Sequence, residues 1–180
     1  FILDPLFSRN LENCNADIYF KPPHSIGYDL KFDIPSELPI KVSVAGEYIA
    51  SSKELTAELK LKDFAPGDFK RYYEDENFSF PSGRFDSVID IKYKDGAVSI
   101  HTETETKGLE YLQDDLSISV AGKEQTSLTY DLSDKNLKYT GSAEIEKMSI
   151  DGIEPIGRIE GIKGNINYSN LGIYSGNLAA

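Results

Sequence analysis

Residues 26–34 read Ile-Gly-Tyr-Asp-Leu-Lys-Phe-Asp-Ile, and this stretch decides the fold class. Apolar side chains stand at every second position from Ile26 to Ile34, while Asp29, Lys31 and Asp33 lie between them. Successive side chains of a β-strand point to opposite faces, so the stretch predicts a strand with one apolar face and one charged face.

The same two-residue alternation recurs along most of the chain, and no segment keeps a helical period over three turns. Lys94-Asp95-Gly96 separates two alternating runs in the manner of a hairpin turn. The sequence therefore predicts an all-β, antiparallel fold. The expected strands are 16–20, 26–34, 40–50, 55–63, 85–94, 97–106, 116–122, 126–132, 137–146, 148–153, 158–162, 164–169 and 171–178.

Length and composition narrow the class of protein. The chain has 180 residues, a net charge of −11 and one cysteine, Cys14. We expect one domain over residues 1–180, with no internal disulfide and no thiolate zinc cluster. The acidic surface disfavours nucleic acid, which is bound through clustered Lys and Arg. The chain opens on Phe1 rather than methionine, which suggests a fragment of a larger protein.

Residues 64–83 interrupt the alternation. Six aromatic residues and two proline-containing turns fall within this stretch. We expect an irregular, aromatic-rich insert that either caps one end of the sheet or serves as a linker, with a short helix across 68–74.

Catalytic and metal-binding patterns are weak. His24 and His101 have no metal-ligand spacing, and His101 alternates with the apolar residues beside it, so we expect it to face solvent. The acidic pairs Asp114-Asp115 and Glu103 with Glu105, and the run 74–76, suit solvated turns and strand faces better than a glycosidase cleft. We therefore expect no enzyme activity, no cofactor and no metal.

Glycine and tyrosine recur in a similar order along the predicted strands. The chain runs from Gly83 through the hairpin to Gly108-Leu109-Glu110-Tyr111, and later reads Leu-Lys-Tyr-Thr-Gly-Ser-Ala over residues 137–143. Val-Ala-Gly-Glu-Tyr over residues 44–48 fits the same order. This cadence, over residues 40–180, resembles the AsmA-like proteins of the bacterial envelope, the group that includes TamB.

The resemblance implies an antiparallel meander that curls into a groove shaped like a taco. It also implies a non-catalytic role in phospholipid transport between bacterial membranes and in outer-membrane biogenesis. The location would be the periplasm or cell envelope, with the parent protein anchored in the inner membrane. Phospholipid or another acyl-chain lipid would be the partner, alongside possible envelope proteins.

Three alternatives stay open. The chain could form a closed β-sandwich or jelly roll that serves as a structural or adhesion module without lipid, a jelly-roll bridge for lipopolysaccharide, or a carbohydrate-active enzyme. If the groove exists, its lipid-facing residues should be the apolar members of the alternation. These are Ile26, Tyr28, Leu30, Phe32, Val42, Val44, Leu59, Leu61, Ile89, Ile91, Val98, Ile100, Ile118, Val120, Leu128 and Tyr130.

Overall fold

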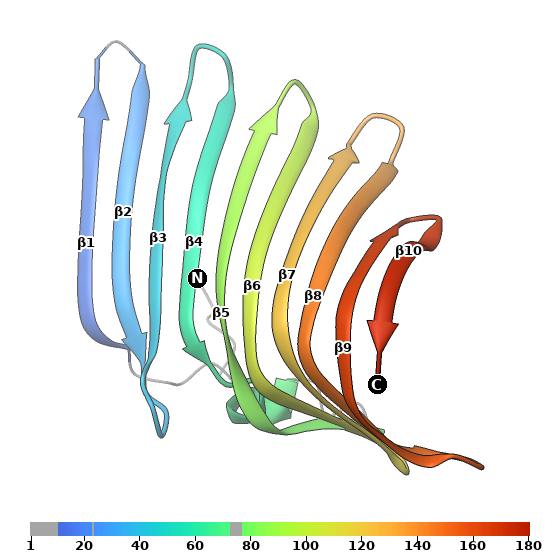
Figure 1. Cartoon of the computed structure of the whole chain (residues 1–180). Helices are drawn as coiled ribbons and strands as arrows, with labels where there is room; N and C mark the ends of the chain where they lie inside the picture. Colours follow the sequence, from blue (N-terminus) through green and yellow to red (C-terminus); the bar gives the residue numbers. More distant parts are fainter. Residues whose placement is uncertain (1–10, 23, 73–76) are drawn as a thin grey trace.

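The computed structural model describes residues 11–22, 24–72 and 77–180, and it forms one antiparallel sheet of ten strands in chain order (Figure 1). Each strand pairs with the strand before it and the strand after it, as in a meander. The strands are β1 (Glu12–Lys21), β2 (Ser25–Ile34), β3 (Ile40–Ile49), β4 (Glu54–Phe64), β5 (Phe78–Lys94), β6 (Ala97–Gln113), β7 (Leu116–Asp131), β8 (Asn136–Ile153), β9 (Gly157–Ser169) and β10 (Gly172–Ala179), with the 3-10 helix η2 (Pro66–Tyr72) between β4 and β5.

The all-β antiparallel prediction is confirmed, but the strands in the second half are fewer and longer than expected. Segments 116–122 and 126–132 are one strand, β7, and the paired segments expected in β8 and β9 likewise merge. A β-bulge lets a strand change direction without leaving its hydrogen-bonded ladder, so breaks in the alternation there mark bends rather than turns.

The insert expected over residues 64–83 is also shorter than predicted. β5 begins at Phe78, so residues 78–83 belong to a strand, and η2 occupies 66–72. Residues 73–76 lie outside the described part of the chain. Phe69 of η2 stacks on Phe64 at 4.9 Å between ring centroids, and Phe64 lies 4.8 Å from Phe85 of β5. The short helix therefore packs on the sheet through a cluster of three phenylalanines.

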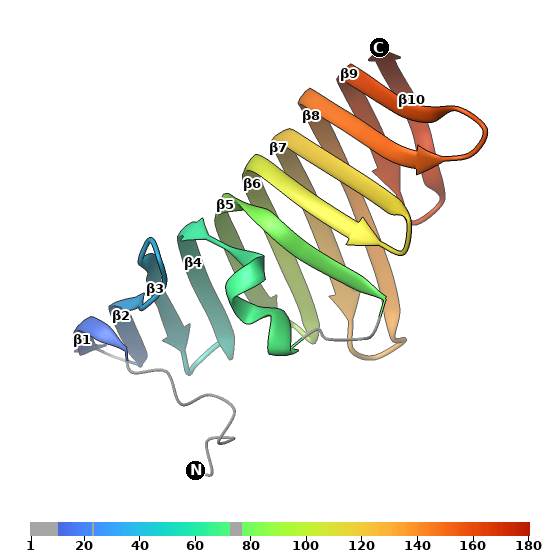
Figure 2. The ribbon, with the colours of Figure 1, turned by 90° about the horizontal axis from the view of Figure 1, so that it is seen from below.

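Strands β5–β9 bend sharply along one line of bulges (Figures 1 and 2). The register shifts near Gly83 in β5, between Thr106 and Leu109 in β6, and opposite Gly122 in β8. The bend divides each of these strands into an upper wall, which carries the hairpin tips at the top of Figure 1, and a lower wall. The lower wall comprises residues 78–82, 109–113, 116–121, 148–153 and 157–162.

Gly83 shows why the bend needs glycine. Its φ is +94°, and a Cβ atom there would lie 2.3 Å from the Cα atom of Leu109 in the neighbouring strand. A side chain would therefore clash with backbone that cannot rotate away.

No second layer covers this sheet. Among the described residues, the backbone of each element lies close only to that of its neighbours in the chain, and the two edge strands, β1 and β10, do not pair with each other. The alternative of a closed sandwich or jelly roll requires two packed layers, so the structure excludes it for this part of the chain. The sheet is curled and open.

Candidate functional site

The apolar members of the alternation form one continuous face. Leu30 pairs with Val44, Val44 with Leu59, and Leu59 with Ile89, so the row crosses four strands without a change of face. β7 carries no bulge of its own between Ile118 and Tyr130, so its lower and upper parts share that face. The register therefore places every residue predicted to face lipid on the same face of the sheet.

Burial identifies which face the bend encloses. Ile145 and Ile162 flank the bend on the apolar face and are 8% and 7% exposed. Their charged neighbours Glu144 and Lys147 point to the other face and are exposed. We call the apolar, enclosed face the inner face and the charged one the outer face.

The inner face is open to solvent over β1 and the hairpin tips, whereas Ile40 and Val42 of β3 are 0% and 7% exposed. In β1 and β2, Ile18, Phe20 and Ile26 are 67%, 77% and 40% exposed. Tyr48 and Leu137, near the hairpin tips, are also exposed. Few large apolar side chains are fully covered, because a single sheet offers no opposing layer to bury them.

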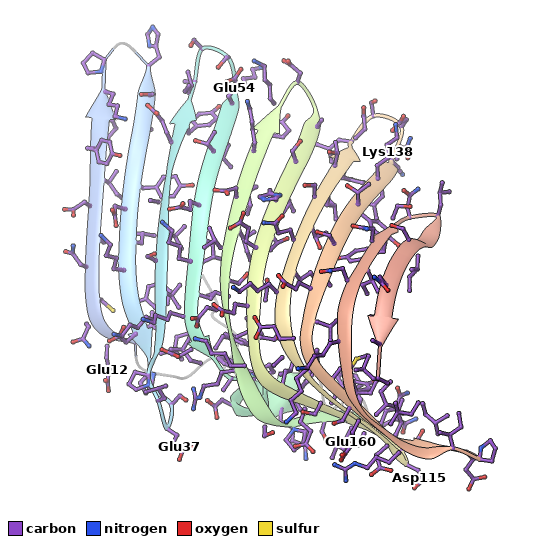
Figure 3. The ribbon with its side chains drawn as sticks, viewed as in Figure 1. Glu12, Glu37, Glu54, Asp115, Lys138 and Glu160 are labelled. Carbon is purple, nitrogen blue, oxygen red and sulfur yellow. The ribbon has the colours of Figure 1, made fainter. Side chains whose placement is uncertain are left out.

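Charged side chains line the outer face and the rims. Figure 3 places Glu54 and Lys138 at the hairpin tips, Asp115 at the end of the β6–β7 hairpin and Glu160 on the lower wall. A polar hollow of about 680 Å³ lies on the outer surface of the lower wall, where Arg158 lies within ion-pair distance of Asp151 and Glu160. An amphiphile on the inner face would therefore meet charge at the edges of the sheet.

A second outer-face cluster holds the bend. Asp86 accepts a hydrogen bond from the backbone N–H of Asp63 at 2.7 Å and from Lys107 Nζ at 2.5 Å. Arg84 donates to the carbonyl of Asp63 at 3.0 Å. Burial raises the pKa of Asp86, but these donors outweigh it and leave the pKa below its ordinary value. These contacts tie together β4, β5 and β6 where the sheet changes direction.

The inner face becomes polar where β6 and β7 approach the bend. The apolar row through Leu59 and Ile89 continues into Thr102 and then Thr126. In the next row, Ser87 Oγ lies 3.0 Å from Thr104 Oγ1, and Thr104 pairs with Glu124. We call this region the polar floor; its members are Ser87, Thr102, Thr104, Thr106, Glu124, Thr126 and Tyr168.

Glu124 and Tyr168 meet on the polar floor from different strands. The Tyr168 ring crosses Gly141 of β8, where a Cβ atom would lie 2.3 Å from Tyr168 Cζ. The Tyr168 hydroxyl donates to the Glu124 carboxylate and lies 2.5 Å from Thr126 Oγ1, which itself donates to Glu124 at 3.1 Å. Burial raises the pKa of Tyr168, and the adjacent Glu124 carboxylate raises it further.

Sequence reasoning missed the inward position of Glu124. The alternation was expected to stop at Gly122 and restart at Thr126, which left Glu124 in a turn. Counting back by twos from Leu128 through Thr126 reaches Glu124 and then Gly122, so the signal was present once β7 is read as one strand.

The other candidates lie apart from the inner face. His101 is on the outer face, with its Nδ1 atom 3.0 Å from Ser127 Oγ, and Glu103 lies beside it on the same face. Asp114 and Asp115 form the turn between β6 and β7, and Cys14 is exposed on β1. The run 74–76 lies outside the described residues.

Within the described ranges, no group of three or more His, Cys, Asp or Glu side chains is placed to hold a metal ion. No described helix has the length and apolar content needed to cross a bilayer.

The chain matches no protein-family model, no curated protein and no solved structure. The resemblance to AsmA-like proteins therefore depends on the sequence pattern alone.

Proposed function

We propose that this chain is a non-catalytic segment of a lipid-binding groove that takes part in phospholipid transport between bacterial membranes. The observation that carries the proposal is the open inner face: one sheet, apolar except at the polar floor, over which the described elements place no second layer apart from η2 at Phe64 and Phe85. An apolar face of this extent is costly to leave in water, and acyl chains are a cover that needs no further protein.

The dimensions and energetics suit acyl chains. Ten strands leave nine gaps of about 4.8 Å, so the inner face runs roughly 43 Å across the strands. Each methylene removed from water contributes about 0.8 kcal/mol, so partial cover of one chain is enough for binding. Movement along such a face requires no covalent chemistry, which agrees with the proposed absence of enzymatic activity.

The cell envelope is the location that this proposal implies, with the parent protein anchored in the inner membrane and acting in outer-membrane biogenesis. An adhesion or structural module would use the same sheet without cargo. A lipopolysaccharide bridge would use it with a different acylated ligand. The lipid bound to the purified protein, if any, distinguishes these alternatives.

The test is extraction of the purified protein followed by lipid mass spectrometry, together with loading from phospholipid vesicles. We expect near-stoichiometric phospholipid on the wild-type protein. Ile91→Asp, which places a carboxylate on the upper wall of the inner face, should lower bound lipid at least about fivefold, because a buried charge next to acyl chains is strongly disfavoured.

Val88→Asp is the matched control. It introduces the same charge into the same strand, but Val88 pairs with Glu103 on the outer face. We expect lipid binding to survive there and circular dichroism to report folded protein for both variants. A folded wild-type protein with no bound lipid would contradict the proposal. Lipid A in place of phospholipid would favour the lipopolysaccharide bridge.

A further inference from the structure

Glu124 is the one charged side chain among the register-paired residues of the inner face that the structure describes. It lies between Thr104 of β6 and Ala143 of β8. The corresponding position on β4 is Leu61, so the charge belongs to the bent half of the sheet alone. A carboxylate in this place acts on any ligand that occupies the inner face.

The carboxylate is held in position rather than free to turn outward. Thr126 and Tyr168 both donate to Oε1, and the Tyr168 ring reaches it only because Gly141 leaves room on the intervening strand. Because both described hydrogen bonds end on Oε1, the lone pairs of Oε2 can accept from a cationic donor of a ligand.

Apolar surface lies on both sides of Glu124. In its own strand, Leu128 on the upper wall and Val120 on the lower wall are each four residues away, which is about 13 Å along a strand. A ligand with apolar chains can therefore cover either wall while a polar group of the same molecule contacts the floor.

Resting on the proposed function, we propose that Glu124 gives the groove a preference for phospholipids whose head carries an ammonium group over phospholipids with an anionic head. The ammonium of such a head is attracted to Glu124, whereas an anionic head is repelled by it. Among the described, register-paired residues of the inner face, no basic side chain offsets this repulsion. Tyr168 and Thr126 act as positioning residues through the hydrogen bonds that hold the carboxylate.

The test is a competition between phosphatidylethanolamine and phosphatidylglycerol with identical acyl chains. Mixed vesicles containing equal amounts of the two lipids are incubated with the purified full chain, and bound lipid is quantified by mass spectrometry. Because Glu124 is exposed, we expect a modest enrichment of the ethanolamine lipid, about two- to fivefold, which should shrink at high salt.

Three variants sharpen the test. Glu124→Gln keeps the acceptor oxygen and removes the charge, so the lipid ratio should return to about one. Glu124→Lys should reverse the ratio in favour of phosphatidylglycerol. Glu103→Gln removes the same charge from the outer face one strand away and should leave the ratio as in the wild type.

The outcomes separate the two proposals. A ratio near one in the wild type, or an enrichment that Glu124→Gln leaves intact, overturns the selectivity while the bound lipid still supports the groove. Absence of bound lipid from the wild type and every variant overturns the proposed function and this inference with it.

Discussion

The N-terminal wing, β1–β4, and the bent half, β5–β9, are built from the same alternating strands but expose them differently. Strands in the wing are 10 or 11 residues long and form one wall, whereas β5–β8 have 16 to 18 residues and cross the bend. Phe20 in the wing is 77% exposed, and Ile145 beside the bend is 8% exposed. Alternation makes the face apolar in both regions, but burial is local: Ile145 is covered at the bend, and Ile40 and Val42 of β3 are 0% and 7% exposed within the wing.

The two regions differ in polarity as well. Along a single row, Leu30, Val44 and Leu59 of the wing give way to Thr102 and Thr126 in the bent half. The wing thus offers an apolar surface that is open on β1 but buried at Ile40 and Val42 of β3. The bent half offers two apolar walls on either side of a polar floor.

The largest effect should come from straightening the bend. Gly83→Ala places a Cβ atom 2.3 Å from the Leu109 backbone at a φ of +94°. Overpacking and left-handed strain together should lower the free energy of unfolding by about 2 to 5 kcal/mol, measured by urea denaturation.

Gly96→Ala is the control for Gly83→Ala, because Gly96 also has positive φ but no atom within 4 Å of the added Cβ. It should cost about 1 to 2 kcal/mol, the strain alone. Equal losses at the two glycines would show that the bend does not depend on close approach at Gly83.

A smaller effect should separate the enclosed and open parts of the inner face. Ile145→Ala removes a buried side chain at the bend and should cost about 2 to 3 kcal/mol. Phe20→Ala, at an exposed position of the wing, should change stability by less than about 0.5 kcal/mol despite the larger side chain. Thermal and urea denaturation of both variants measure the difference. A Phe20→Ala loss matching that of Ile145→Ala would mean that the wing is covered in solution.

The smallest effect should be acid sensitivity at the bend. The folded pKa of Asp86 lies below its ordinary 3.8, so the folded state binds fewer protons there than the unfolded state. This contribution to stability is present above pH 3.8 and is lost as the pH falls through the folded pKa.

Asp86→Asn should therefore reduce stability at neutral pH and flatten the decline on acidification, measured by urea denaturation at about pH 7 and about pH 3.5. Asp90→Asn, an exposed carboxylate four residues along the same face, is the control and should leave the acid profile unchanged. If stability declined equally with pH in the wild type and in Asp86→Asn, the ion pair between Asp86 and Lys107 would have no role in acid sensitivity.

Local sequence patterns were sufficient to predict much of the fold and much of the inner face. The all-β class, the Asp95-Gly96 hairpin and the shared face of residues such as Leu30 and Ile89 all follow from side-chain alternation. The strand count failed in β8, where a bulge shifts the alternation between Ile145 and Met148, and in β7 and β9, where the alternation continues through Gly122 and Gly164 but glycine was interpreted as a strand end.

The sequence by itself determined that each strand has one apolar side, since that property depends only on neighbours two residues apart. Tertiary structure alone decided that no second sheet covers this side in the described part of the chain, that the bulges align into one bend, and that Tyr168 reaches Glu124 across an intervening strand. The physical reason is that register joins residues far apart in the chain, and pairing between strands, rather than local preference, sets it.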